Sequence, residues 1–462
     1  MNESPYDLVV IGSGPAGQKA AISAAKLGKR VAVVERGGML GGVSVHTGTI
    51  PSKTFREAAL YLTGFTQRAF YGPGYRLREH ITKQDIISRV QSIVERETEI
   101  VRGQFMKNYI TQLDGTARFV DPHTLEISSA EGAVLISAGH ILIACGSRPS
   151  RDSGIPFDGV RVIDTDGLPG IAELPRDLII VGGGVIGLEY TSIFAALDIP
   201  VTLIDQRQQI LDFADREIVE ALCYHLRELD VTFRLGEKVV GVDVEPGRDR
   251  VVARLESGKA VHGGAILYAV GRQANSDLLN LPAAGIEAGP RGRLKVNEFF
   301  QTAVAHIYAA GDIIGFPALA ATSMEQGRLA SCHMFGAPFH HAPELFPLGI
   351  YTIPEISMVG RTEGQLTAAK IPYETGVARY EELAKAQMLG DRTGMLKLLF
   401  DANTLKLLGV HGIGQRSAEI IHIGQAVLAF GGKVDYFRDT VFNYPTLAEA
   451  YRVAALNGLN KL

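Results

Sequence analysis

The sequence predicts an α/β protein with two Rossmann-like domains and a C-terminal α+β domain. Its 462 residues are enough for about three domains of roughly 100–200 residues each. A pattern of strand, glycine turn, helix and second strand occurs twice, once near the N-terminus and once near the middle. From about residue 349 onward, strands and helices continue without a glycine fingerprint, which indicates a separate domain.

The first copy of the pattern begins with an apolar, β-branched run, LVVIG, which is typical of a buried parallel strand. Gly12, Gly14 and Gly17 follow, then an apolar-periodic helix, a second strand and Glu35. In a dinucleotide-binding turn the first glycine allows the tight bend, the second lets the backbone approach a pyrophosphate, and the third lets the helix pack on the sheet. Free N–H groups at the helix start bind phosphate, and the acid binds ribose hydroxyls.

The second copy aligns with the first without a gap. Its glycines are Gly182, Gly184 and Gly187, and its acid is Asp205. In both copies the acid lies 18 positions after the third glycine, close to the ~20 expected of this motif. Because the whole unit recurs in order, we predict two dinucleotide sites. Two such sites in one chain suggest one tightly held redox cofactor and one exchanging nicotinamide nucleotide.

The remaining elements follow from the same patterns. A long helix is expected over 83–108, and a linker rich in turn residues over 148–159 separates the first unit from the second, at 160–272. Asp312 follows a strand and a glycine, and a helix is expected over 318–335. Short strands are expected at 116–120, 124–127, 134–137, 140–144, 239–244, 251–255 and 265–270.

Composition and charge exclude several function classes. The net charge is -4 and no basic stripe appears, so nucleic acid is not an expected partner. The longest apolar runs are shorter than the ~20 residues of a membrane helix, and the N-terminal MNESPYDLVVIG does not look like a secretory signal. We therefore expect a cytoplasmic protein that does not bind membranes. Cys145, Cys223 and Cys332 are far apart, so no metal site is predicted.

Motifs spread over essentially the whole chain resemble those of the two-dinucleotide-binding-domain flavoproteins, the class-I pyridine nucleotide-disulfide oxidoreductases. They are GSGPAG, GTIPSK, ACGSRP, GGGVIGLE, VGRQAN, AAGD and NYPTLAEA. The resemblance implies an FAD-binding domain at 1–150, an NAD(P)-binding domain at 151–273, a return to the FAD domain at 274–345 and a dimer-interface domain at 346–462. It further implies FAD, NAD(H) and NADP(H) as cofactors, with a homodimer as the assembly.

Two departures from the family pattern bear on the chemistry. Disulfide-reducing members carry a cysteine pair where this chain has Ser44 and Thr49. Neither hydroxyl can replace a thiol, because thiol–disulfide exchange needs a thiolate. Near the C-terminus, Tyr444 replaces the histidine of the family's His-Pro pair, while Glu449 is kept. A phenol is a poor proton shuttle at neutral pH, so the thiol and its proton partner are lost together.

These departures, with YTIPEIS, AEIIHIGQA and the ending FNYPTLAEAYRVAALNGLN, make the chain similar to the transhydrogenase branch of the family. That likeness implies the reaction NADPH + NAD+ ⇌ NADP+ + NADH. Since one exchanging nucleotide site would serve donor and acceptor in turn, ping-pong kinetics are expected. Hydride transfer is the cofactor's own chemistry, and the protein supplies position and electrostatics.

The resemblance also assigns site residues. Lys53 is expected beside flavin N5, paired with Glu189, and Asp312 is expected to bind the ribityl chain. Tyr444 and Glu449 complete the catalytic candidates; the sequence leaves open whether Tyr444 is a lid from the partner subunit or an interface aromatic. The predicted FAD-binding residues are Gly12, Gly14, Gly17, Glu35, Arg36, Gly42, Ser44, Thr49, Lys53, Gly146 and Asp312. The predicted NAD(P)-binding residues are Gly182, Gly184, Gly187, Asp205, Arg207, Gly271 and Arg272.

Nucleotide preference stays open at this point. Asp205 is typical of NAD sites, and its charge would repel a 2′-phosphate by up to about 4 kcal/mol at about 4 Å and an effective dielectric of about 20. Arg207, two positions later, could pair with that phosphate. Two other functions share the motifs: an NAD(P)H:acceptor reductase that reduces a quinone, dye or dioxygen, preferring NADH because of Asp205, and a flavin-bearing redox sensor without turnover.

Overall fold

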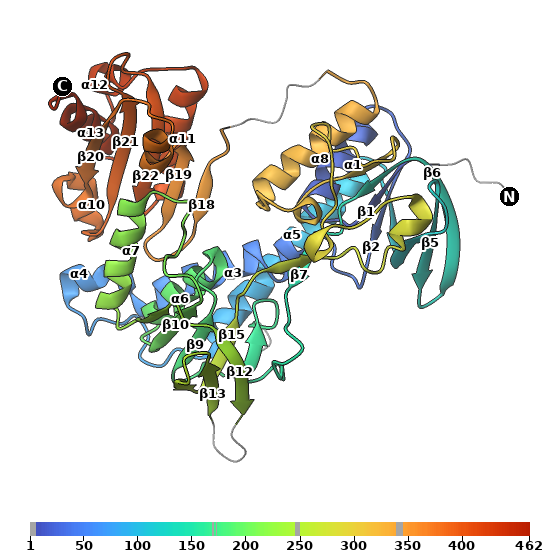
Figure 1. The fold of residues 1–462 in the computed structure, drawn as a ribbon, viewed down its shortest axis with the longest axis horizontal. Helices are drawn as coiled ribbons and strands as arrows, with labels where there is room; N and C mark the ends of the chain where they lie inside the picture. The colour runs from blue at the N-terminus through green and yellow to red at the C-terminus, as the bar shows by residue number, and fades with distance from the viewer. Residues whose placement is uncertain (1–5, 169–170, 172, 245–249, 339–344) are drawn as a thin grey trace.

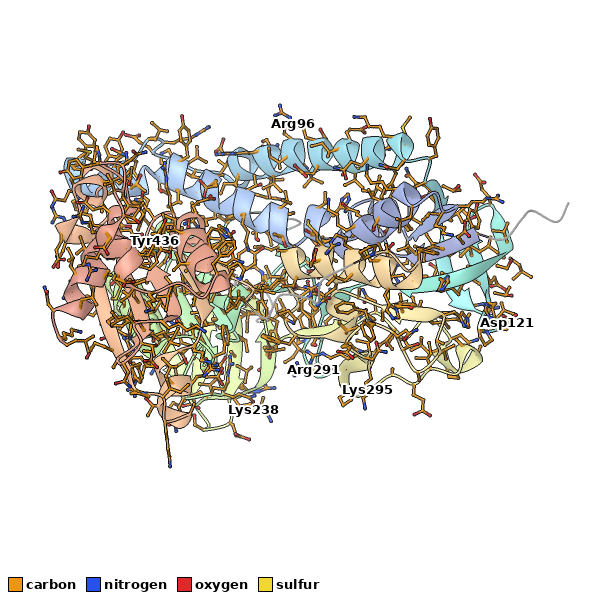
Figure 2. The ribbon with its side chains drawn as sticks, turned by 90° about the horizontal axis from the view of Figure 1, so that it is seen from above. Arg96, Asp121, Lys238, Arg291, Lys295 and Tyr436 are labelled. Carbon is orange, nitrogen blue, oxygen red and sulfur yellow. The ribbon has the colours of Figure 1, made fainter. Side chains whose placement is uncertain are left out.

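The computed structural model describes residues 6–168, 171, 173–244, 250–338 and 345–462. Figure 1 shows three parts: the first domain with the segment that returns to it, the nucleotide domain below the centre, and the C-terminal domain at upper left. In Figure 2, Arg96 lies on the outer side of the long helix α5, and Lys238, Arg291 and Lys295 lie on the opposite side of the molecule. Among the described residues, no helix is both long and apolar enough to cross a membrane.

The first domain has a sheet in the order β3-β2-β1-β6-β5-β4, with β17 also paired to β6. Strands β1, β2, β3 and β17 run parallel to their neighbours. The apolar side chains of β1, β2 and β17 are buried on both faces, whereas β3 is an exposed edge strand. The strands are β1 (Tyr6–Ile11), β2 (Val31–Glu35), β3 (Thr111–Asp114), β4 (Thr116–Phe119), β5 (Thr124–Ser129), β6 (Gly132–Ile143) and β17 (Ile307–Ala309). The helices are α1 (Pro15–Lys26), α2 (Gly42–His46), α3 (Thr49–Thr63), α4 (Arg68–Tyr71), α5 (Lys83–Lys107) and α8 (Ala320–Met334).

One expectation in this domain is wrong. The two strands expected at 134–137 and 140–144 are a single strand, β6. Its first part pairs antiparallel with β5 from Gly132 to Ser137, and its second part pairs parallel with β1 from Ala138 onward. The break in the apolar pattern therefore marks a change of pairing partner rather than a turn. The long helix expected over 83–108 is confirmed as α5, which begins with a capping box of Thr82 and Asp85.

The nucleotide domain has a parallel sheet in the order β11-β10-β9-β15-β8 and a three-stranded antiparallel sheet, β12-β13-β14. A short ribbon of β7 and β16 joins it to the first domain. Its helices are α6 (Val185–Ala196) and α7 (Arg216–Glu228). The strands are β7 (Ser147–Pro149), β8 (Val162–Asp164), β9 (Leu178–Val181), β10 (Val201–Asp205), β11 (Thr232–Leu235), β12 (Val239–Val244), β13 (Val251–Leu255), β14 (Ala260–Gly263), β15 (Ala265–Tyr268) and β16 (Arg272–Ala274).

The C-terminal domain is an antiparallel sheet in the order β18-β19-β22-β21-β20, packed with helices. Its strands are β18 (Leu348–Ile350), β19 (Ile356–Gly360), β20 (Tyr373–Arg379), β21 (Met395–Asp401) and β22 (Leu407–Ile413). Its helices are α9 (Glu363–Ala368), α10 (Ala384–Leu389), α11 (Ser417–Ala429), α12 (Asp435–Asp439) and α13 (Glu449–Leu459). This arrangement is the α+β domain that the sequence predicts.

One apolar core crosses all three parts. It joins Phe55 of α3, Phe194 of α6, Leu222 of α7, and Met395 and Ile413 of the C-terminal sheet. Buried area of this kind contributes roughly 25 cal/mol per Å² and holds packed elements in a fixed arrangement. Side chains at the junction of the three domains are therefore held in place by packed elements of each domain.

Candidate functional site

A cavity of ≈ 560 Å³ lies where the first domain, helix α6 and the start of the C-terminal domain meet. It opens at the carboxyl ends of β1 and β6, the place where ligands bind in open parallel sheets. It brings together twelve of the predicted site residues: Gly12, Gly14, Glu35, Arg36, Gly42, Ser44, Thr49, Lys53, Gly146, Glu189, Arg272 and Asp312. Gly17 supports this wall from behind, at the packing contact between α1 and β1.

At one end of the cavity, Glu35 is held in place by the glycine turn. Its carboxylate accepts hydrogen bonds from the backbone N–H of Ser13 at 2.8 Å and of Arg36 at 2.8 Å, and from the Ser13 hydroxyl. The start of α1, with Gly14 at the N-cap and Pro15 at the first turn, has no side-chain cap. Its free N–H groups and positive dipole end are therefore available to an anion. This arrangement fits the adenosine and pyrophosphate portion of FAD.

The middle of the cavity contains a polar chain that the sequence did not predict. Asp312 accepts a hydrogen bond from the Ser147 hydroxyl at 2.7 Å, and that hydroxyl accepts one from Arg272 Nε at 2.8 Å. Arg272 also pairs with Asp166 at 3.1 Å. Arg272 thus lines the cavity together with Val185 and Ile186 of the 182–187 turn and α6, because β16 pairs with β7 and carries Arg272 toward the first domain. Ser147 occurs in the ACGSRP motif, which was the available signal.

An ion pair of a half-buried lysine with a buried glutamate also lines the cavity. Lys53 Nζ contacts the Glu189 carboxylate at 2.7 Å and 2.9 Å, linking α3 of the first domain to α6 of the nucleotide domain. Glu189 is nearly inaccessible and also accepts a hydrogen bond from the backbone N–H of Tyr351 at 2.9 Å. The Tyr351 ring lies 5.0 Å below the Lys53 ammonium, in a cation–π contact. The pairing of Lys53 with Glu189 expected from the resemblance is present. Tyr351 contacts both members of this pair; it is the first residue of the YTIPEIS motif, but no sequence pattern indicated this role.

At the two positions where the resemblance would place cysteines, the cavity is lined by hydroxyls. Ser44 and Thr49 both line the cavity. Of the described cysteines, Cys145 also lines it, but burial raises the pKa of its thiol to about 12. Its S–H donates to the carbonyl of Asn275 at 3.2 Å. A thiol with that pKa is protonated at neutral pH and is inert as a nucleophile.

The second glycine turn forms a separate site on the nucleotide domain. Gly184 is the N-cap of α6, which again begins without a side-chain cap. Asp205 accepts hydrogen bonds from the backbone N–H of Gly183 at 2.5 Å and of Arg207 at 2.7 Å, and from Arg207 Nε at 3.0 Å and Nη2 at 2.8 Å. Although burial opposes ionisation, the hydrogen bonds from Arg207 and Gly183 lower the pKa of Asp205. The sequence analysis assigned Asp205 and Arg207 as separate contacts to the nucleotide. In the structure they form one ion pair with each other.

The second glycine of each turn, Gly14 in the first and Gly184 in the second, gives a test of the two sites. A Cβ on Gly14 or Gly184 would meet nothing within 4 Å, whereas one on Gly17 or Gly187 would lie 2.0 Å or 1.8 Å from a carbonyl oxygen. We therefore expect Gly14→Ala and Gly184→Ala to fold normally while the new methyl group crowds the pyrophosphate. Each should weaken the binding of its own ligand by roughly 5- to 150-fold, the range of an overpacking cost of about 1–3 kcal/mol.

The measurement is FAD content after purification, together with the Kd of NAD+ and NADP+ for the holoprotein. Gly14→Ala should lower FAD content, and Gly184→Ala should raise both nucleotide Kd values with FAD content unchanged. Equal loss of FAD from both variants would contradict the assignment of the two turns to two different ligands.

Tyr444 and Glu449 do not join the cavity within one chain. Tyr444 is 71% exposed, and Glu449 lies at the first turn of α13, with one buried carboxylate oxygen that has no hydrogen-bond partner among the described residues. Gly271 also lies away from the cavity, at the junction of β15 and β16, where its carbonyl accepts the N–H of Ser150 at 3.0 Å. A role for Tyr444 or Glu449 in the cavity would therefore require a second copy of the chain.

Known proteins have the same domain organisation. The family model for pyridine nucleotide-disulphide oxidoreductases matches residues 6–327, and the model for the dimerisation domain of that family matches residues 346–455. A protein of Mycobacterium bovis (strain BCG / Pasteur 1173P2) named soluble pyridine nucleotide transhydrogenase is 55% identical over 459 residues, covering 99% of this chain and 98% of that protein. A protein of Klebsiella pneumoniae with the same name is 45% identical over 465 residues, again covering 99% and 98%.

Solved structures agree in fold. LpdA of Mycobacterium tuberculosis has a TM-score of 0.90 at 26% identity, covering 97% of this chain and 99% of that chain. The HOCl-induced flavoprotein disulfide reductase RclA of Escherichia coli, in a Cu(II) complex, has a TM-score of 0.88 at 27% identity, covering 98% of this chain and 99% of that chain. The two glycine turns and the C-terminal domain thus occur in an architecture already known for flavoproteins.

Proposed function

The chain belongs to the pyridine nucleotide-disulphide oxidoreductase family, and from this premise we propose that it is an FAD-dependent enzyme that transfers hydride between NADPH and NAD+. The proposal is supported by the names of the relatives and by one observation: the cavity around Lys53 and Glu189 is lined by Ser44 and Thr49 where a thiol relay would lie. Bound FAD would supply the two-electron chemistry. The chain's own residues bind, orient and exclude water.

Each part of the cavity has a distinct task in this proposal. The turn of Gly12 and Gly14, with Glu35, holds the adenine half of FAD, and Asp312 holds the chain that leads to its ring. Lys53 places a half-buried cation in the cavity wall, where it would stabilise negative charge on the bound group. The α6 residues Val185, Ile186, Glu189 and Tyr190 form the opposite wall, and a nicotinamide bound at the 182–187 turn would approach along it.

A single nucleotide turn supports a ping-pong order. Donor and acceptor would use the Gly182–Gly187 turn one after the other, because both carry the same pyrophosphate and nicotinamide. The experiment is to purify the protein with FAD bound and to follow reduction of thio-NAD+ by NADPH at several concentrations of each. Parallel double-reciprocal plots are expected. Failure to reduce thio-NAD+ while a quinone is reduced by NADH would favour the acceptor-reductase function instead.

Thiol chemistry gives a second test of the proposal. Alkylation with iodoacetamide near neutral pH should leave the transhydrogenase rate unchanged within about twofold. The reason is that burial raises the pKa values of the Cys145 and Cys223 thiols, and Cys332 is buried away from the reagent, so little accessible thiolate is present. A loss of most activity that follows modification of Cys145 would show that a sulfur participates, contrary to the proposal. Mass spectrometry of the treated protein identifies the modified cysteine.

We also infer a homodimer formed through residues 346–462. The C-terminal domain exposes large apolar side chains, with Phe430 at 91%, Val441 at 87% and Tyr444 at 71%. The match of residues 346–455 to the dimerisation domain of the family supports this part of the chain as the contact surface.

All three cysteines are unpaired, which is the state that a reducing compartment maintains, so the cytoplasm remains the expected location.

A further inference from the structure

A fully buried lysine connects the C-terminal domain to the nucleotide domain. Lys397 of β21 is 1% exposed, and its ammonium contacts three carboxylates: Asp215 at 3.0 Å, Glu217 at 2.9 Å and Glu363 at 3.3 Å. Asp215 and Glu217 belong to the nucleotide domain, at the start of α7, whereas Glu363 belongs to the C-terminal domain. Figure 1 shows α7 rising from the nucleotide domain to lie beside the C-terminal sheet.

The lysine is present as a cation. Burial lowers its pKa, but the hydrogen bonds and charges of Glu217 and Asp215 outweigh that effect, so the pKa of Lys397 lies above its ordinary value. Its cross-strand neighbour His411 is buried beside it, and the Nε2–H of His411 donates to the carbonyl of Arg361 at 2.9 Å. Burial lowers the pKa of His411, which favours its neutral form. At this contact the Lys397 cation therefore faces carboxylates from two domains.

The contact lies at the end of the loop that follows Asp205 and contains Arg207, the two residues expected to select the nucleotide. Residues 206–215, the 206–215 loop, connect Asp205 of β10 to α7, and Asp215 is the N-cap of that helix. Near its start the loop contains Arg207, and in its middle Ile210 and Leu211 are buried in the shared core. The Cγ2 atom of Ile210 lies 2.7 Å from the position that a Cβ on Gly183 would take, so the loop packs directly on the pyrophosphate turn.

We propose that Lys397 is a positioning residue for the nucleotide site: by fixing Asp215 and Glu217, the C-terminal domain sets the place of the 206–215 loop and with it the affinity for the adenosine half of NAD(P). This inference rests on the proposed function only in taking the 182–187 turn as the nucleotide site. A rigid connection is the physical requirement, and a fully buried pair provides it, because an unpaired buried charge is strongly unfavourable. The lysine contacts no ligand and acts through the loop.

The test measures binding without turnover. ADP-ribose and 2′-phospho-ADP-ribose are titrated calorimetrically into the FAD-loaded protein, since neither can exchange hydride. Lys397→Met should raise both Kd values by roughly tenfold, within the range known for residues that couple through packed contacts. Lys397→Arg, which keeps the cation, should stay within about threefold of wild type. The kcat at saturating nucleotide should fall by less than about twofold in both variants.

Two acids make a matched control that does not depend on the lysine variant folding. Glu217 and Glu363 contact the same ammonium and are 44% and 39% exposed, but only Glu217 crosses to the nucleotide domain. Glu217→Gln should weaken ADP-ribose binding by roughly threefold, and Glu363→Gln should leave it unchanged. Equal effects of the two, or a folded Lys397→Met protein with wild-type affinity, would overturn the inference. A wild-type protein that binds neither ligand would instead refute the proposed function.

Discussion

Replacing Lys53 by methionine should lower the kcat of transhydrogenation by about 100-fold, the typical effect of removing one preorganised electrostatic group. The ammonium lies within 2.7 Å of Glu189 in the centre of the cavity, and Glu189 is 5% exposed in its side chain. Methionine keeps the length and apolar stem of lysine but leaves the buried Glu189 carboxylate without its cation, with only the Tyr351 N–H as a partner among the described residues. The measurement is the initial rate of thio-NAD+ reduction by NADPH at saturating concentrations, normalised to bound FAD.

Lys29→Met is the matched control for this variant. Lys29 is half-buried and lies 5.1 Å from the ring of Phe335, a cation–π contact like that of Lys53 with Tyr351, but it does not line the cavity. Its replacement should change kcat by less than about twofold. In a double-mutant cycle, Lys53→Met with Glu189→Gln should lose no more activity than Lys53→Met alone, because the two side chains act as one pair. A Lys53→Met enzyme with full FAD content and a kcat near wild type would refute this role.

The parts of the site that could be predicted from the sequence depend on local pattern. The turns at Gly12 and Gly182 were predictable because strand, glycine spacing, helix and acid lie within one βαβ unit, and local geometry determines their shape. The Lys53–Glu189 pair joins residues 136 positions apart, so only the family resemblance pointed to it. The ACGSRP motif marked the segment that contains Ser147, but the hydrogen-bonded chain from Asp312 through Ser147 to Arg272 could not be predicted, since it depends on β7 pairing with β16.

The errors have a similar origin. Periodicity divided β6 into two strands because it reports which side chains are buried, and β6 changes neighbours halfway along its length. The burial of Lys397 is likewise invisible in the sequence: the run MLKLLF reads as a buried strand with one charge, and the three carboxylates come from other elements. Tertiary contacts of long sequence separation decide both features.

Arg207→Ala should shift the nucleotide preference, measured as the ratio of kcat/KM for NADPH to that for NADH, toward NADH by roughly 10- to 100-fold. Loss of a charge-assisted hydrogen bond of about 1.5–3 kcal/mol sets this range. In the structure, the four hydrogen bonds to Asp205 fill the roughly four acceptor positions of a carboxylate, and Arg207 makes three of them. The ribose hydroxyls of NAD(H) therefore compete with the Arg207 side chain for Asp205, whereas a 2′-phosphate can take that side chain away.

Without the guanidinium, Asp205 is free for the ribose hydroxyls and unscreened against a 2′-phosphate, so the two nucleotides should respond in opposite directions. Asp205→Asn should move the ratio the other way, because the amide oxygen can still accept the Gly183 N–H while the repelling charge is gone. Arg234→Ala is the control: Arg234 is exposed on β11 beside Ile204 and should leave the ratio unchanged. An Arg207→Ala ratio equal to that of wild type would mean that the 2′-phosphate is recognised elsewhere, since one bound nucleotide places its adenosine ribose at a single position along β10.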